Sequence, residues 1–187
     1  MRVRHILAAT LIGLTANCST PLTRVELAPL QSTLTLRAAV SSALVRTVEL
    51  PTYAAEEAIS VQGSDGLILS GDAVLWADDP ARAATAAIAQ NLASILSVVI
   101  APEPWPFADI PDVTVEVRVT QLLTGNDGIL RMRGQYFVGG DGVDYPAIVR
   151  SFAHSVALET PGFEGIAAAQ SQALLALSED IARDLDL

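Results

Sequence analysis

VTVEVRVT at residues 113–120 and LRMRGQYFV at residues 130–138 are the strongest structural signal in the sequence. Apolar and polar residues alternate in both segments, which is typical of a β-strand with one buried face. The intervening Gly125-Asn126-Asp127-Gly128 favours a turn. We therefore predict an antiparallel hairpin.

Two amphipathic helices stand on either side of this hairpin in the sequence. The first is predicted from Pro80 to about Ile100. Asp79 is a suitable N-cap and proline favours the first helical position, whereas Pro102 prevents continuation. The second is predicted to follow a cap at Thr160-Pro161 and to reach the chain end, with apolar residues at three- and four-residue steps.

Shorter strands complete the predicted sheet. A first strand is predicted within residues 34–48, two more on either side of a turn at residues 63–66, and another within residues 148–158. Together these elements predict an α/β or α+β fold. It is a single layered domain in which two long amphipathic helices cover a mainly antiparallel sheet.

The N-terminus has the pattern of an export signal, and residues 1–17 are predicted as a signal peptide. Arg2 and Arg4 precede an apolar run at residues 6–16, which is too short for the roughly 18 residues of a membrane span. Cys18, the only cysteine, follows directly, and LTANC at residues 14–18 is similar to the lipobox of bacterial lipoproteins. Two interpretations stay open: acylation of Cys18, for example with palmitate, and ordinary secretion after cleavage near Ala16. We favour acylation.

Residues 18–33 are polar and interrupted by Pro21 and Pro29. They are predicted to form a lipidated N-terminal tether or a loosely docked arm, and residues 34–187 to form the folded domain. A tether of about fifteen residues reaches roughly 50 Å when extended. As a tether, this segment would let the domain stand away from its membrane.

The charge of the chain argues against nucleic acid as a partner. The predicted mature chain carries nine arginines, no lysine and 21 acidic residues, a net charge of −12. Such a surface repels phosphate backbones and anionic headgroups. We therefore expect no nucleic-acid binding, and we expect membrane contact to come from a lipid anchor or a protein partner.

No catalytic, cofactor-binding or metal-binding set is predicted. His154 is the only histidine of the predicted mature chain, and a catalytic triad or histidine metal site would depend on this one imidazole. Ser64 lies in a turn without the strand-then-helix context of a nucleophile elbow. Residues 139–144 match one copy of a calcium-binding repeat that functions in stacked copies. We interpret His154 as a structural or surface histidine and expect no enzyme activity.

Further segments occur in a characteristic order: VELPTY at residues 48–53, ISV at 59–61, WADDP at 76–80, NLA at 91–93 and IAAAQSQAL at 166–174. In this order and spacing they resemble the ABC-type transport auxiliary lipoproteins, a family that includes the lipoprotein of the paraquat-inducible lipid-transport system. The resemblance covers about residues 45–187. Leu75 departs from it, because the family often has arginine before the tryptophan.

The resemblance implies a non-enzymatic lipoprotein that is anchored through Cys18 to the periplasmic face of the outer membrane. The implied partners are an inner-membrane ABC transporter and an MCE-type periplasmic protein that carries lipid between the membranes. The family also implies a homo-oligomeric ring. Within such an assembly Trp76 and Trp105 are candidate interface residues, although packing in the core is an equally good interpretation of both.

Two alternative functions stay open. One is a free-standing periplasmic lipoprotein that regulates an envelope enzyme through its sheet or helix face. The other is a secreted hydrolase that uses His154, which the lack of further catalytic groups in the sequence disfavours.

Overall fold

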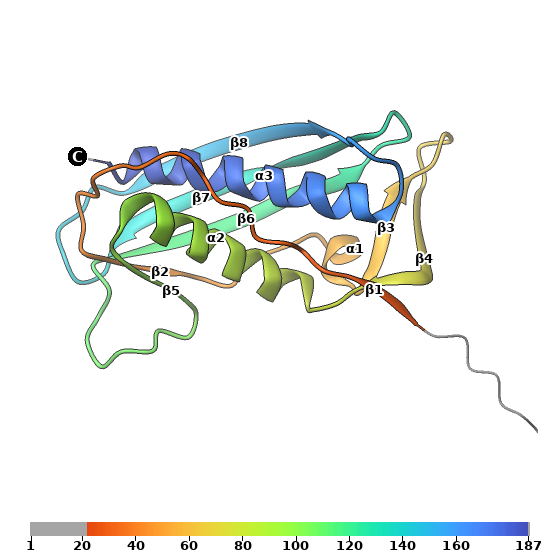
Figure 1. Cartoon of the computed structure of the whole chain (residues 1–187). Helices are drawn as coiled ribbons and strands as arrows, with labels where there is room; N and C mark the ends of the chain where they lie inside the picture. The colour runs from red at the N-terminus through yellow and green to blue at the C-terminus, as the bar shows by residue number, and fades with distance from the viewer. Residues whose placement is uncertain (1–21, 187) are drawn as a thin grey trace, which may run out of the picture.

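The predicted hairpin is confirmed in the computed structural model, which describes residues 22–186. It consists of β6 (Val113–Thr124) and β7 (Ile129–Gly140), and β7 pairs antiparallel on its other side with β8 (Ile148–Ala157). The turn is closed by Gly125 N, which donates to Ile129 O at 2.9 Å. These three strands are the longest ladder of the sheet (Figure 1).

Two smaller groups of strands share the other edge of β6. At its N-terminal end, β2 (Ser42–Val45) pairs parallel with β6 and with β5 (Val99–Pro102). At its C-terminal end, β6 meets β3 (Ala58–Gln62), which pairs antiparallel with β4 (Ile68–Trp76). The edge strand β1 (Thr23–Val25) then joins β4 in parallel. The eight-stranded sheet is therefore mixed, although its longest pairings are antiparallel.

Two long helices lie side by side on one face of this sheet (Figure 1). They are α2 (Pro80–Leu96) and α3 (Phe163–Asp184), whereas α1 (Thr52–Ala55) is a single turn. Their apolar stripes and the inward side chains of the strands form one core, because burying both removes the most apolar surface from water. The layered α/β prediction is confirmed. Among its largest fully buried side chains are Ile88, Leu92, Ile95, Leu130, Met132, Leu174, Leu177 and Ile181.

Both helix boundaries differ from the prediction. Asp79 caps α2 as expected, since its Oδ1 accepts a hydrogen bond from Arg82 N at 2.8 Å. However, α2 ends at Leu96 instead of near Ile100, because Ser97 has a left-handed φ of 55° and the next residues enter β5. The α3 cap is Gly162, with φ 92°, and not the predicted Thr160-Pro161.

The predicted first strand within residues 34–48 is also wrong in its extent, because only Ser42–Val45 belongs to the sheet. Residues 34–40 have alternating burial, but they lie against the helices. Leu36 N donates to Ile95 O at 2.9 Å, and Ala39 N donates to Leu185 O at 2.8 Å. The period-two pattern therefore reflects an extended segment that packs on helices.

Residues 34–40 are the last part of a longer docked arm that begins at Leu22. After β1, residues 26–40 cross the outer side of both helices (Figure 1), and Ser32 Oγ donates to Glu179 Oε1 at 2.6 Å. Docking removes most of the predicted 50 Å tether, because only the four residue steps from Cys18 to Leu22 precede the arm, a span of at most about 14 Å. Cys18 and the predicted signal peptide, residues 1–17, lie outside the described residues.

No helix within residues 22–186 is both long enough and apolar enough to cross a membrane.

Candidate functional site

Large exposed apolar side chains gather at two places on the domain. The first, which we name the hairpin tip, is Leu67-Ile68-Leu69, where the three residues are 62%, 43% and 53% exposed. The second, the aromatic loop, is residues 103–112 between β5 and β6, where Phe107 is 53% and Ile110 67% exposed. Figure 1 shows the β3–β4 hairpin and the β5–β6 loop at opposite ends of the molecule. Clustered apolar exposure of this kind marks surfaces that bind partners or membranes.

Hydrogen bonds to the β2 region hold both ends of the aromatic loop. At its start, Glu103 N donates to Val45 O at 2.9 Å and Glu103 Oε2 accepts from Thr47 N at 3.1 Å. At its end, Asp112 Oδ2 accepts from Ser41 N at 2.7 Å. The loop therefore projects from a fixed base.

The aromatic side chains of the loop pack on each other. The Trp105 and Phe107 rings meet edge to face, with centroids 5.1 Å apart at 68°. Trp105 Nε1 also donates to Asp109 Oδ1 at 3.3 Å. Aromatic side chains ordered in this way provide large contact area with little entropy left to lose on binding, which is typical of protein interfaces.

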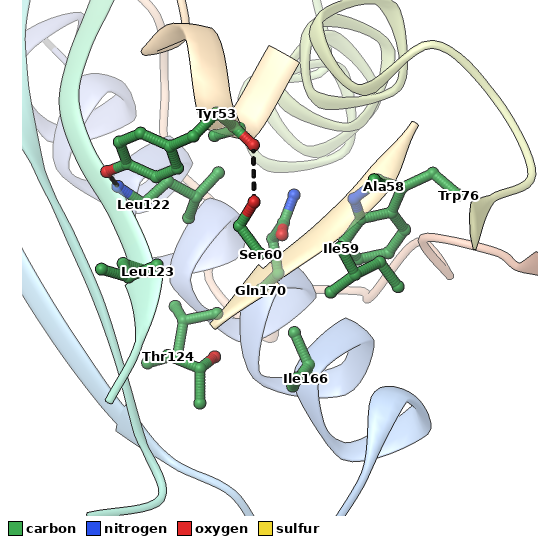
Figure 2. A pocket seen from close by; sticks show the side chains of 12 residues that line it. Tyr53, Ala58, Ile59, Ser60, Trp76, Leu122, Leu123, Thr124, Ile166 and Gln170 are labelled. Carbon is green, nitrogen blue, oxygen red and sulfur yellow. Dashed lines mark hydrogen bonds between the residues drawn. The ribbon is translucent and has the colours of Figure 1, made fainter. Parts of the chain in front are cut away.

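Trp76, the other predicted interface residue, lies in the core at 7% exposure. It lines a cavity of about 20 Å³ between β3, β6 and α3, shown in Figure 2. Ser60 Oγ donates to Tyr53 O at 3.0 Å beside it, and Thr124 Oγ1 is buried with no hydrogen-bond partner among residues 22–186. A space of this size holds about one water molecule. The position of Trp76 therefore favours core packing over contact with a partner.

A polar cluster ties the end of α3 to the sheet. Tyr136 Oη donates to Asp184 Oδ2 at 2.7 Å, and Arg150 Nε lies 3.2 Å from the same oxygen. Tyr145 Oη donates to Asp184 O at 2.9 Å. Burial, followed by the hydrogen bond to the Asp184 carboxylate, raises the pKa of Tyr136 far above its usual range. Burial likewise raises the pKa of Tyr145. The cluster stabilises the fold with both phenols protonated.

Tyr136→Phe is expected to destabilise the domain at pH 7 by about 2 kcal/mol, because a hydrogen bond to a carboxylate is lost. The wild-type pKa is raised above the unfolded value of about 10, so stability present below pH 10 is lost as pH rises further. Because Tyr136→Phe has no phenol at this position, the free energy of unfolding of the variant is expected to decrease less above about pH 10 than that of the wild type. Urea unfolding between pH 7 and 11 measures both effects, and equal alkaline slopes in the two proteins would contradict the assignment.

His154 lies on β8 beneath α3, with its side chain 18% exposed. Its ring stacks on Phe152 with centroids 6.0 Å apart, and its Nε2 lies 3.2 Å from Asp180 Oδ2 without hydrogen-bond geometry. Ser64 lies in the β3–β4 turn, closed by Gly63 N donating to Leu67 O at 2.8 Å. Within residues 22–186 no group of three or more His, Cys, Asp or Glu side chains is placed to hold a metal.

Sequence reasoning missed the exposure of the hairpin tip and of Phe107 and Ile110. The strand predicted after the turn at residues 63–66 includes Leu67 and Leu69, but a strand prediction does not say that both side chains face solvent. One signal was available, because three consecutive apolar residues, Leu67-Ile68-Leu69, break the alternation of a strand with one solvated face. For the aromatic loop the proline-rich sequence indicated irregular structure but not which side chains face solvent.

Comparison with solved structures shows a shared fold. A crystal structure described as an uncharacterized protein is similar with a TM-score of 0.72 and 22% identity, covering 88% of this chain and 98% of that chain. A Xanthomonas campestris protein of the DUF330 family is similar with a TM-score of 0.65 and 11% identity, covering 85% of this chain and 92% of that chain. No functionally curated protein matches the sequence.

One family model matches most of the domain. The model of the ABC-type transport auxiliary lipoprotein component matches residues 26–182, from the docked arm to the last turn of α3. This confirms the resemblance found in the sequence. The chain belongs to the family of ABC-type transport auxiliary lipoprotein components.

Proposed function

We propose that this protein is a non-enzymatic, lipid-anchored subunit of an MCE-type ABC transport system that moves lipid between the inner and outer membranes. Family membership over residues 26–182 is the observation that carries the proposal. The proposed anchor is acylated Cys18 on the periplasmic face of the outer membrane. The proposed partners are an MCE-type periplasmic protein and the ABC transporter subunits, with further copies of this chain in a ring.

A docking or scaffold role is supported by the arrangement of the domain. The described N-terminus and the aromatic loop lie at opposite ends of the molecule (Figure 1). An anchor at one end leaves the other end, with Trp105 and Phe107, free to meet a protein partner. The hollow lined by Trp76 has room for about one water molecule and not for an acyl chain.

The test is affinity purification of the full-length protein from gently solubilised envelopes, with quantitative mass spectrometry of the proteins that accompany it. Trp105→Ala combined with Phe107→Ala is expected to lower recovery of the MCE subunit by about tenfold or more, because aromatic anchors dominate interface energy. The matched control is Val149→Ala, which changes an apolar residue 55% exposed on β8. Recovery of the MCE subunit with this control is expected to equal recovery with the wild type.

The outcomes separate the competing functions. Absence of all transport subunits from the wild-type sample contradicts the proposal, and a cell-wall synthase in their place supports a regulator of an envelope enzyme. Equal recovery with the double variant and the wild type contradicts the role of the aromatic loop alone. The mass of the N-terminal peptide from the same sample shows whether Cys18 is acylated.

A further inference from the structure

We propose that the hairpin tip, Leu67-Ile68-Leu69, is a second membrane contact that enters the headgroup region of the bilayer beside the acylated Cys18. The inference rests on the proposed anchor and adds a contact made by the folded domain itself. Its consequence is orientation, because two separated points of attachment hold a domain at a defined angle whereas a single acylated residue does not.

The hairpin carrying the tip projects beyond the body of the sheet. All of residues 68–73 of β4 are exposed, on both faces of the strand, although Trp76 at the other end of β4 is buried. The turn before the tip is held by Gly63 N, which donates to Leu67 O, and by Asp65 Oδ1, which accepts from Leu67 N at 3.1 Å. The tip is thus an ordered apolar projection with no covering element among the described residues.

The chain leaves the domain toward the same end. Because β1 pairs parallel with β4, with Thr23 opposite Val74, β1 begins at the same end of the molecule as the β3–β4 hairpin; in Figure 1 this is the right-hand end, with the hairpin turn at the top and the start of β1 at the bottom. Leu22, the first described residue, is 56% exposed there. Cys18 is at most about 14 Å of chain from Leu22, and Ile68 is six residues from Val74 along β4, about 20 Å. A bilayer that holds the acyl chains is therefore within reach of the hairpin tip.

This short connection is maintained because β1 is fixed to the domain. Arg24 Nη1 donates to Trp76 O at 2.6 Å, and Arg24 Nη2 lies 3.0 Å from Glu57 Oε2. Ala77 N donates to Val25 O at 2.8 Å. Peeling the arm away to gain reach would break these contacts together with the β1–β4 ladder.

The chemistry of the tip selects the kind of membrane. Leu67-Ile68-Leu69 is bracketed by Asp65 and Asp72 and has no basic residue between them. Anionic headgroups would be repelled by these carboxylates, whereas a zwitterionic surface accepts the apolar side chains without that cost. The occupant is therefore a zwitterionic phospholipid surface, reached through apolar insertion and not through charge.

The experiment uses the predicted mature chain, residues 18–187, coupled through its single thiol at Cys18 to a maleimide phospholipid in phosphatidylcholine vesicles. Coupling in this way makes anchoring independent of acylation in the cell. Hydrogen exchange read by mass spectrometry is expected to be about fivefold or more slower in residues 62–73 on vesicles than in the uncoupled chain. Residues 103–112, at the opposite end, are expected to exchange equally in both.

Two variants make the result specific. One variant replaces Leu67, Ile68 and Leu69 with serine, and it is expected to abolish the slowing of exchange in residues 62–73. Because the tip is exposed, the rest of the domain is expected to keep its wild-type exchange rates. Ile110→Ser, a matched exposed apolar position in the aromatic loop, is expected to leave the slowing intact.

Three results would overturn the inference: no slowing on vesicles, equal slowing in the triple-serine variant, or slowing without vesicles that increases with protein concentration. The last of these results would show that the tip contacts a second copy of the chain and not a membrane. An unmodified Cys18 in the N-terminal peptide from cells counts against the proposed function, whereas the vesicle measurement decides the contact.

Discussion

Gly134→Ala is expected to destabilise the domain by about 3 kcal/mol, although adding a methyl group to a strand glycine ordinarily stabilises the strand. Gly134 lies near the middle of β7, between Val119 on β6 and Phe152 on β8. A Cβ at this position would overlap the carbonyl oxygen of Arg118 and come within 2.8 Å of Phe152 Cζ and 2.9 Å of Val119 Cα. Two of these atoms belong to the backbone of the neighbouring strand, so they move only if the ladder opens.

The local structure explains the close approach. The register of β6 shifts between Val119 and Gln121, which is a β-bulge beside Gly134, and the buried Phe152 ring occupies the space that a side chain would take. Bulges and aromatic neighbours of this kind are typical places for a strand glycine.

Urea unfolding followed by circular dichroism measures the effect of Gly134→Ala. The matched control is Gly139→Ala in the same strand, where an added Cβ meets nothing within 4 Å. This control is expected to be neutral or stabilising by about 0.5 kcal/mol, through a less flexible unfolded chain. Equal stability of the two variants would show that the strands separate more easily at Gly134 than their contacts indicate.

Leu177→Ala is expected to cost about 3 kcal/mol, because it removes buried methyl groups and leaves a cavity in a close-packed core. Leu177 is fully buried on α3, within the single hydrophobic core that joins the two helices to the sheet. For a domain of this size the loss corresponds to a decrease in Tm of about 6 to 12 °C.

Thermal unfolding of Leu177→Ala beside Leu177→Met checks this expectation. Methionine nearly conserves the volume of leucine, so that variant is expected to lose less than about 1.5 kcal/mol. If the two variants melted together, the volume lost at this position would not account for the destabilisation. An alanine variant as stable as the wild type would place Leu177 outside the cooperative core.

The docked arm lies almost entirely within the region that the family model matches. The matched region begins at residue 26, just after β1, and the arm crosses both helices before β2 starts. The domain therefore starts within a few residues of the proposed anchor, and the aromatic loop projects from the far end (Figure 1). Under the proposed function, this arrangement would place the aromatic loop at the end of the domain away from the anchor.

Elements with local signals were predicted well from the sequence. The alternating valines of β6, the turn at residues 125–128 and the Asp79-Pro80 start of α2 depend on neighbours within a few residues, and all three are confirmed. The family resemblance also came from the order of local segments. The candidate contact surfaces were harder, because exposure depends on what the rest of the chain covers, as Trp76 and the hairpin tip show.

Local physical chemistry was therefore sufficient for the hairpin, the helix faces and the class of the fold, since hydrophobic period, caps and turn residues act over one or two turns of chain. The end of α2 and the place of residues 34–40 required long-range partners. Ile100 belongs to β5 because it pairs with Ala43 of β2. Leu36 packs on α2, where its backbone N donates to Ile95 O. The free energy of such contacts depends on surfaces brought together from distant parts of the sequence, so it is defined only once the chain has folded.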